Sequence, residues 1–272
     1  MAERICCRHT WFMTIVDELL VEADRNIVGA WRAVLAGSPR PGDARDGAVT
    51  LLSSGLPVPL FNPAFVTGAV NDPEVTVRRI VDHYASRGAP FAVYFRDEVA
   101  PGLAEACDAA GLLEHWRPAL MVLAPIPPTD PSPMPDLTIR RVTTHTVDDY
   151  AAVLSAGFGL PRELADLLFR TSLLGIAGLS AFIGTVQGEP VGSAAVFVSD
   201  GVAGIYNIAT VPSRRGKGIG EAMTWAAVKA GEEAGMTCAI LQASEQGEPV
   251  YERMGFETPS RYRQFEPADG SS

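Results

Sequence analysis

The segment that decides the fold is Ile208-Ala-Thr-Val-Pro-Ser-Arg-Arg-Gly-Lys-Gly-Ile-Gly-Glu221. It begins inside an apolar run, Val202 to Val211, which predicts a buried strand. It leads into residues 218–233, where apolar side chains recur at helical spacing, and Gly235 is the glycine expected just after a helix. The segment therefore predicts a tight turn that joins a buried strand directly to an amphipathic helix.

Two familiar phosphate-binding turns do not fit this segment. A P-loop needs Ser or Thr after its lysine, whereas Lys217 is followed by Gly218. The dinucleotide fingerprint would use Gly216 and Gly218 and needs a third glycine where the chain has Glu221. The pattern that remains is R-x-x-G-x-G.

This remaining pattern, Arg215, Gly218 and Gly220, suits a pyrophosphate. Glycine lets the backbone approach phosphate oxygens, and the free N–H groups of the first helical turn point at the anion. Arg215 and Lys217 can add charge-assisted hydrogen bonds. The plainer alternative is an ordinary glycine-rich turn with a solvated basic edge. The order strand, proline, basic glycine turn, helix favours the phosphate site.

The rest of the second half alternates strands and helices. Pro161 suits the start of a helix, and turns at residues 187–189 and 199–201 suit strand hairpins. The expected strands are 137–142, 179–186, 190–198, 202–211, 236–243 and a last one at 262–265; the expected helices are 147–158, 162–174, 218–233 and 249–254. This order predicts an α/β fold with a mixed sheet and one buried strand–helix–strand crossover.

The proline-rich segment 124–135 marks the clearest boundary, because its prolines cannot sustain helix or central strand. The expected division is a first domain at 1–124, a linker at 125–136 and a second domain at 137–268. In the first half we expect helices at 16–35 and 75–86, strands at 91–95 and 119–123, and a loop at 37–47. Their order loosely parallels the second half, as a diverged duplicate would.

Two motifs in the second half resemble those of one family. Residues 211–223, Val-Pro-Ser-Arg-Arg-Gly-Lys-Gly-Ile-Gly-Glu-Ala-Met, look like the pyrophosphate-binding motif of the GNAT superfamily of N-acetyltransferases. Residues 249–257, Pro-Val-Tyr-Glu-Arg-Met-Gly-Phe-Glu, look like that family's second signature, near the thiol end of the cofactor. They occur in the family's order, and the resemblance runs from residue 137 to the end. It implies two GNAT-like domains, the first a degenerate copy.

The resemblance also implies roles for particular residues. Acetyl-CoA would be the co-substrate, and Tyr251 the acid that reprotonates the departing CoA thiolate; the alternative for Tyr251 is a core aromatic whose hydroxyl bonds a neighbour. Ser244 stands where many members have asparagine and would bond the pantetheine arm. Pantetheine and the thioester would meet the backbone of Ile208, Ala209 and Thr210, and pyrophosphate would meet the amides of Gly216, Lys217, Gly218, Ile219, Gly220 and Glu221.

No general base is evident. The family's usual base positions hold Asn207 and Ala239, which are not carboxylates. The carboxylates Glu245, Glu163 and Asp149 are each expected on a solvated surface, and a base acting through ordered water is an equal alternative.

Composition limits the other partners. A net charge of −10 disfavours nucleic acid and weakly favours cationic acceptors. No apolar run could cross a membrane and no signal peptide is evident, so we expect a cytoplasmic protein. The cysteines and histidines show no metal-ligand spacing, so no metal site is expected.

The leading hypothesis is transfer of an acetyl group from acetyl-CoA to an amine of a small molecule or peptide, by a monomer or homodimer. The alternative is a non-catalytic module that binds or senses acyl-CoA. A third possibility is that the first half supplies a surface for a partner and the protein acts mainly in assembly. Residues 56–63 are expected to be a packed connector, and residues 158–161 to lie near the acceptor.

Overall fold

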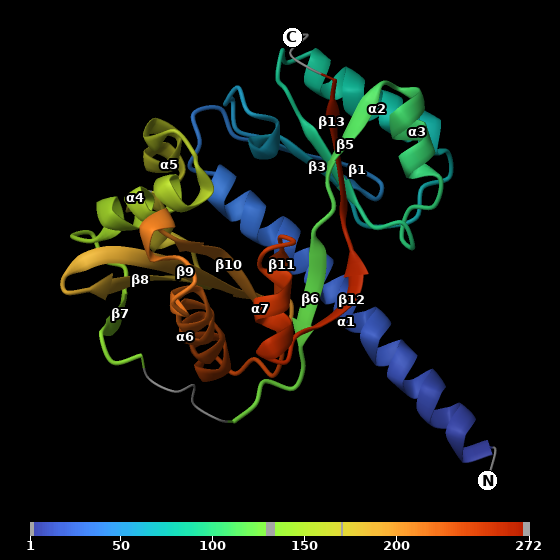
Figure 1. The fold of residues 1–272 in the computed structure, drawn as a ribbon. Coiled ribbons are helices and arrows are strands. Elements are labelled where there is room, and N and C mark those ends of the chain that lie inside the picture. Colours follow the sequence, from blue (N-terminus) through green and yellow to red (C-terminus); the bar gives the residue numbers. More distant parts are fainter. Residues whose placement is uncertain (1–2, 129–133, 170, 269–272) are drawn as a thin grey trace.

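The chain folds into two sheets, described by a computed structural model (Figure 1). The described residues are 3–128, 134–169 and 171–268, and for residues 3–16, 171 and 172 the backbone alone is described. The side chains of Cys6, Cys7 and His9 therefore lie outside the description, as does the middle of the proline-rich segment. The first sheet has the order β1-β2-β3-β4-β13-β5 and the second the order β12-β6-β11-β10-β9-β8-β7.

The N-terminal half begins with a long helix, α1 (Glu3–Leu35), whose N-terminal end extends away from the body (Figure 1). Strands β3 and β4 are parallel, and α2 connects them. The other elements of this half are β1 (Gly42–Asp46), β2 (Val49–Ser53), η1 (Pro59–Phe61), β3 (Pro63–Val66), α2 (Pro73–Ala85), β4 (Ala92–Phe95), α3 (Leu103–Ala109), β5 (Leu112–Trp116) and β6 (Ala119–Leu123).

The C-terminal half contains the predicted mixed sheet with its crossover. Strands β10 and β11 are parallel and α6 connects them, whereas the strands from β7 to β10 pair antiparallel. The elements are β7 (Leu137–Arg141), α4 (Val147–Phe158), α5 (Arg162–Leu168), η2 (Thr171–Gly175), β8 (Leu179–Val186), β9 (Glu189–Ser199), β10 (Val202–Thr210), η3 (Pro212–Arg214), α6 (Ile219–Glu233), β11 (Ala239–Ala243), α7 (Glu248–Arg253), β12 (Glu257–Arg261) and β13 (Arg263–Pro267).

Several predicted elements have different bounds: α1 begins at Glu3, not at residue 16, and β11 begins at Ala239, not at residue 236. The helix expected at 162–174 ends at Leu168, and the chain continues in the 3-10 turn η2. The loop expected at 37–47 contains β1, which pairs with β2 over its whole length. This prediction was wrong because Gly42 and Asp43 have low strand propensity, and pairing with the apolar strand β2 outweighs that preference.

The last strand of each half lies in the other half's sheet. β6 lies between β11 and β12, antiparallel to both, and β13 lies between β4 and β5 in the same way. The prediction that the last strand closes the second half was therefore wrong. The sheets exchange strands across the proline-rich segment, so the division at residues 125–136, which remains a prediction for the domains, does not coincide with the division between the sheets.

The two halves repeat one topology. In each, three antiparallel strands (β1-β2-β3 and β8-β9-β10) end in the first strand of a parallel β-α-β crossover (β3-α2-β4 and β10-α6-β11), which is followed by a short helix and an outer strand. The C-terminal half has β7 in addition. In both halves, a strand from the other half fills the place between the crossover's second strand and the outer strand. This correspondence is structural evidence for the duplication that the element order suggested.

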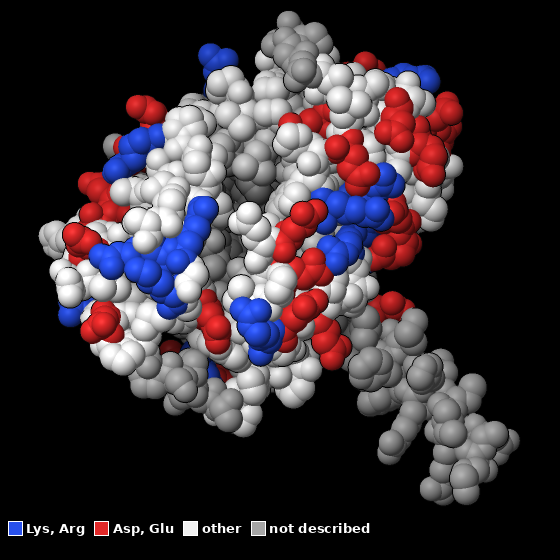
Figure 2. Space-filling view, viewed as in Figure 1, with Lys and Arg blue, Asp and Glu red and all other residues white. Residues whose placement is uncertain are grey.

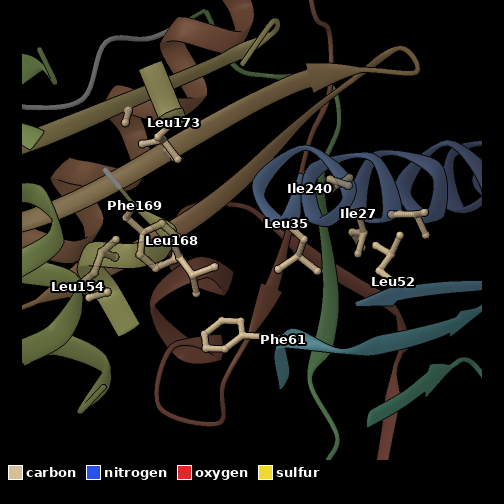
Figure 3. Packing of buried hydrophobic residues seen from close by; sticks show 14 of the residues in the cluster. Ile27, Leu35, Leu52, Phe61, Leu154, Leu168, Phe169, Leu173 and Ile240 are labelled. Atoms are coloured by element: carbon tan, nitrogen blue, oxygen red, sulfur yellow. The ribbon is translucent and has the colours of Figure 1, made fainter. Parts of the chain in front are cut away.

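An apolar core joins the two halves (Figure 3). Leu35 on α1 and Phe61 on η1 belong to the same buried cluster as Leu154 on α4 and Leu168 on α5. Burying one large apolar side chain contributes roughly 1.5–3 kcal/mol, so this shared cluster strongly favours the docked arrangement. Leu56 and Phe61 are buried, which favours a packed connector at residues 56–63 over the alternative of a loop that lines the acceptor site.

A buried polar network crosses the same boundary. Arg96, after β4, donates to Asp24 of α1, with Nη2 and Oδ2 2.7 Å apart, and both side chains are less than 5% exposed. The hydroxyl of Tyr262, between β12 and β13, also bonds Asp24. A buried charge that loses its partner is costly, so these residues fix α1 against the point where the chain passes from one sheet to the other.

Candidate functional site

The turn before α6 has the geometry of an anion site. Gly216 and Gly218 have φ values of +72° and +79°, which L side chains rarely adopt, and Gly218 is the N-cap of α6. No side chain caps this helix end. The amides of Ile219, Gly220 and Glu221 follow in its first turn, where helical N–H groups lack intrahelical partners. The turn can therefore present its N–H groups and the positive end of the helix dipole to an anion.

Basic side chains gather on this turn, and Figure 2 shows a patch of Lys and Arg on the lobe that contains it. Lys217 and Arg215 are exposed and Arg214 is half-buried. The guanidinium of Arg215 is held by backbone, with Nη2 2.6 Å from the carbonyl oxygen of Gly157 and Nε 3.3 Å from that of Thr210. These bonds connect the turn to α4 and occupy two of the N–H groups of Arg215. A phosphate contact by Arg215 remains a prediction, and it would use the other N–H groups of the guanidinium.

Strands β10 and β11 separate toward this turn. Their parallel pairing stops at Ile205 and Leu241, although β10 continues to Thr210 and β11 to Ala243. Among the described residues, the β11-facing edge of β10 therefore has no partner strand over Ile208, Ala209 and Thr210. An extended ligand can bond this free edge, as a short added strand would.

A bulge shapes the free edge. The register of β10 on β9 shifts between Tyr206 and Ala209, and Asn207 has a φ of +55°. The side-chain N–H of Asn207 donates to the hydroxyl of the buried Tyr150 on α4 (3.0 Å), and the backbone carbonyl of Asn207 accepts from the hydroxyl of Ser193 (2.9 Å). A bulge re-aims the backbone beside it, and these two bonds hold it in place.

Helix α4 ends directly on the bulged strand. A Cβ on Gly157 would lie 2.6 Å from that of Ala209, so only glycine permits this approach. Beyond it, residues 158–161 lie beside the turn, and the ring of Phe158 is 51% exposed. Figure 2 shows this face hollowed between the lobe that carries α4 and α5 and the N-terminal half. That residues 158–161 lie near the acceptor remains a prediction.

Tyr251 on α7 is 9% exposed and belongs to the core cluster that includes Met223 of α6. Burial raises the pKa of its phenol to about 12, and a hydrogen bond with Thr224 opposes part of this rise. The phenol is therefore fully protonated near neutral pH and can donate a proton. Both roles considered for Tyr251, acid and core aromatic, agree with this environment.

The other predicted site residues are exposed. The Ser244 hydroxyl accepts from the amide of Gly247 (3.3 Å), which helps to start α7. Glu245, Glu163 and Asp149 are all exposed, as expected for solvated carboxylates. The contacts of Ser244 and of these three acids do not indicate a role for any of them in the site.

The sequence did not single out Tyr150, Gly157 or Thr224. Tyr150 and Thr224 looked like ordinary helical positions, and only the fold brings them to the bulge and to Tyr251. Gly157 carried a usable signal, because a glycine within a helix often marks a close approach.

Neither a cluster of metal-ligating side chains nor a membrane-spanning helix occurs in the described part of the chain. No group of three or more His, Cys, Asp or Glu side chains there could hold a metal ion. No helix among those residues is long and apolar enough to cross a membrane.

Comparisons with known proteins identify the kind of domain. Residues 151–256, which include the turn, the bulge and Tyr251, match the model of the acetyltransferase (GNAT) family. No curated protein sequence matches the chain.

Solved structures resemble the whole chain. A GCN5-related N-acetyltransferase from Kribbella flavida is 20% identical with a TM-score of 0.71, and the match covers 90% of this chain and 96% of that one. One from Sphaerobacter thermophilus is 16% identical with a TM-score of 0.62, covering 83% and 79%. A tandem GNAT protein from the clavulanic acid biosynthesis pathway is 17% identical with a TM-score of 0.60, covering 88% of each chain. At these identities the likeness concerns the fold, which is shared over both halves.

Proposed function

We propose that this chain, whose residues 151–256 belong to the acetyltransferase (GNAT) family, transfers an acetyl group from acetyl-CoA to an amine of a small molecule or peptide. The observation that carries the proposal is the junction of two features at the end of β10. The uncapped helix end behind Gly218 suits a pyrophosphate, and the free edge at residues 208–210 suits the pantetheine arm and thioester.

The chain's own groups supply the rest of the chemistry. The amine attacks the thioester carbon, and backbone N–H groups at the bulge stabilise the charge that develops on the carbonyl oxygen. Tyr251 donates its proton to the sulfur as the C–S bond breaks. The attacking nitrogen releases a proton to solvent, from which Tyr251 is reprotonated. The turn and the strand edge hold the reacting carbon in one place, which makes attack effectively intramolecular.

The test begins with donor binding. Isothermal titration of CoA and acetyl-CoA is expected to show one site per chain. Thiol release from acetyl-CoA in the presence of an amine panel then measures transfer. Tyr251→Phe is expected to lower the rate by about 10- to 100-fold and leave CoA affinity nearly unchanged, because it removes only the acid.

Each other outcome has a distinct meaning. Binding without thiol release for any amine supports the non-catalytic acyl-CoA-binding alternative. No binding of CoA contradicts both functions. An unchanged rate in Tyr251→Phe contradicts only the acid role and leaves Tyr251 as a core aromatic.

A further inference from the structure

The side-chain amide of Gln242 on β11 has a buried nitrogen, Nε2, with no hydrogen-bond partner, although the residue as a whole is half-buried. Among the described residues, four side chains have a buried polar atom without a partner, and the other three, Ser38, Ser53 and Tyr94, lie in the N-terminal half. An unbonded buried N–H destabilises a fold, and such groups are uncommon in native proteins. A bound ligand is therefore the first partner to consider for Gln242.

Gln242 stands where β10 and β11 begin to separate. The last parallel pair joins Ile205 to Leu241, so Gln242 is the first residue of β11 beyond this pairing. On its other side β11 remains paired with β6, where Gln242 lies opposite Leu120. The fold therefore holds the backbone of Gln242 in place at the start of the gap that opens toward the free edge of β10.

The side chain of Gln242 is on the face of the sheet opposite α6. Side chains alternate between the two faces of a strand. Leu241 belongs to the core cluster formed with α6, whereas Ile240 belongs to the cluster that contains residues of α1 and α4. By this alternation Gln242 shares the face of Ile240. Helix α4 meets the bulge of β10 on the same face, where Asn207 bonds Tyr150.

A thioester carries the kind of group that this amide can bond. Its carbonyl oxygen only accepts hydrogen bonds, and the carboxamide nitrogen only donates them. In the proposed reaction, negative charge develops on that oxygen while the amine adds to the carbonyl carbon. A donor fixed beside the oxygen is bonded more strongly in this transition state than in the substrate, and this difference accelerates the reaction.

We infer that Gln242 is a catalytic residue of the proposed acetyl transfer, on which this inference rests: its Nε2 donates a hydrogen bond to the thioester oxygen. Backbone N–H groups at the bulge donate to the same oxygen from the β10 side of the gap. As the C–N bond forms, the carbonyl electron pair moves to the oxygen. Its return breaks the C–S bond, the sulfur takes the proton of Tyr251, and the nitrogen loses a proton to solvent. Gln242 itself transfers no proton.

The kinetic test uses two substitutions and a matched control. Gln242→Met removes the donor at similar length, and Gln242→Glu replaces the N–H group by oxygen at nearly constant shape. Tyr94→Phe is the control, because it also deletes a buried, unbonded polar atom, but from β4 in the N-terminal half.

Gln242→Met is expected to lower kcat by about 100-fold, the usual effect of removing one oxyanion donor. Its affinity for CoA, which has no thioester, should stay within about twofold of wild type. Gln242→Glu should lose at least as much activity, because an ionised carboxylate repels the developing charge, and Tyr94→Phe should stay near wild type. An unchanged kcat in Gln242→Met overturns the inference, as does full activity in Gln242→Glu.

An infrared measurement tests the hydrogen bond without any acceptor amine. Acetyl-CoA labelled with 13C at the thioester carbonyl is bound to each protein, and its C=O stretch is read as the difference from unlabelled acetyl-CoA. The stretch should lie at lower frequency in wild type than in Gln242→Met, because a hydrogen bond weakens the C=O bond. Equal frequencies in the two proteins overturn the inference whatever the activity. A shifted carbonyl without transfer to any amine contradicts the proposed function alone, and no binding of acetyl-CoA to wild type contradicts both.

Discussion

The crossovers β10-α6-β11 and β3-α2-β4 occupy corresponding places in the two halves, but the turns before their helices differ in how the first N–H groups of the helix are bonded. The turn before α6 ends in the uncapped Gly218, whereas the turn before α2 ends in Asp72, whose carboxylate accepts from the amide of Val75 (2.9 Å). The first residue of α2 is Pro73, which has no N–H. The N-terminal turn thus satisfies internally the donors that the C-terminal turn leaves for an anion.

The strands behind the two turns differ as well. β3 and β4 remain paired over their whole length, so no edge opens between them, whereas β10 and β11 separate after Ile205. The cleft between α2 and α3 is lined by three carboxylates, Asp72, Glu74 and Glu105. These differences favour donor binding at the C-terminal turn, where the helix end is uncapped and the strands separate, so we expect the N-terminal half to be catalytically silent.

The largest expected effect comes from cutting the exchanged strand that makes the halves interdependent. Ending the chain after Tyr262 removes β13 from between β4 and β5, and the N-terminal sheet should lose more than about 5 kcal/mol, the lower end of a domain's stability. Hydrogen exchange should then show β4 and β5 unprotected. A chain ending after Ala268 is the control; full protection in the shorter chain would contradict the structural role of the exchange.

Placing an acidic N-cap residue in the C-terminal turn, as the N-terminal turn has, tests the comparison directly. Gly218→Asp places a carboxylate at the N-cap of α6, as Asp72 does for α2, and should weaken CoA binding by about 100-fold or more. Isothermal titration measures the loss. Gly188→Asp is the matched control, since Gly188 has a similar φ of +83° in an open hairpin turn, and it should bind CoA normally.

The reverse change should have a smaller effect. Asp72→Ala removes the cap of α2 and should cost about 1 kcal/mol of unfolding free energy, measured by urea denaturation. It should not create a second CoA site, because β3 and β4 remain paired and Glu74 and Glu105 remain in the cleft. Binding of two CoA equivalents per chain, in this variant or in wild type, would contradict the expectation that the N-terminal half does not bind CoA.

The smallest expected effect concerns pH. Burial raises the pKa of Tyr251 from its ordinary 10.0 to about 12, so the acid stays protonated through pH 10. A phenol with the ordinary pKa would be half deprotonated at pH 10, which would halve the rate. We expect no such fall in kcat between pH 8 and 10, with circular dichroism confirming that the protein remains folded. A twofold fall over that interval in folded protein would contradict the acid role in this buried setting.

Local elements were predicted well where one physical signal dominated. Helical spacing predicted the observed bounds of α4, residues 147–158. The turn at residues 187–189 likewise fixed the predicted end of β8 at residue 186. Strand β12 was not predicted, because it is mostly exposed and contains Pro259. Among the described strands, β12 pairs with β6 alone, and β6 comes from the other half, so no local sequence pattern can show this pairing.

The sequence by itself determined the anion turn, because the left-handed backbone at Gly216 and Gly218 and the helix that follows are local properties of those residues. It also identified Tyr251 as the candidate acid through a motif. The tertiary structure alone decided the exchange of β6 and β13 and the separation of β10 from β11. Each of these depends on contacts between residues distant in the chain, whose energies come from packing and hydrogen bonds that the local sequence does not encode.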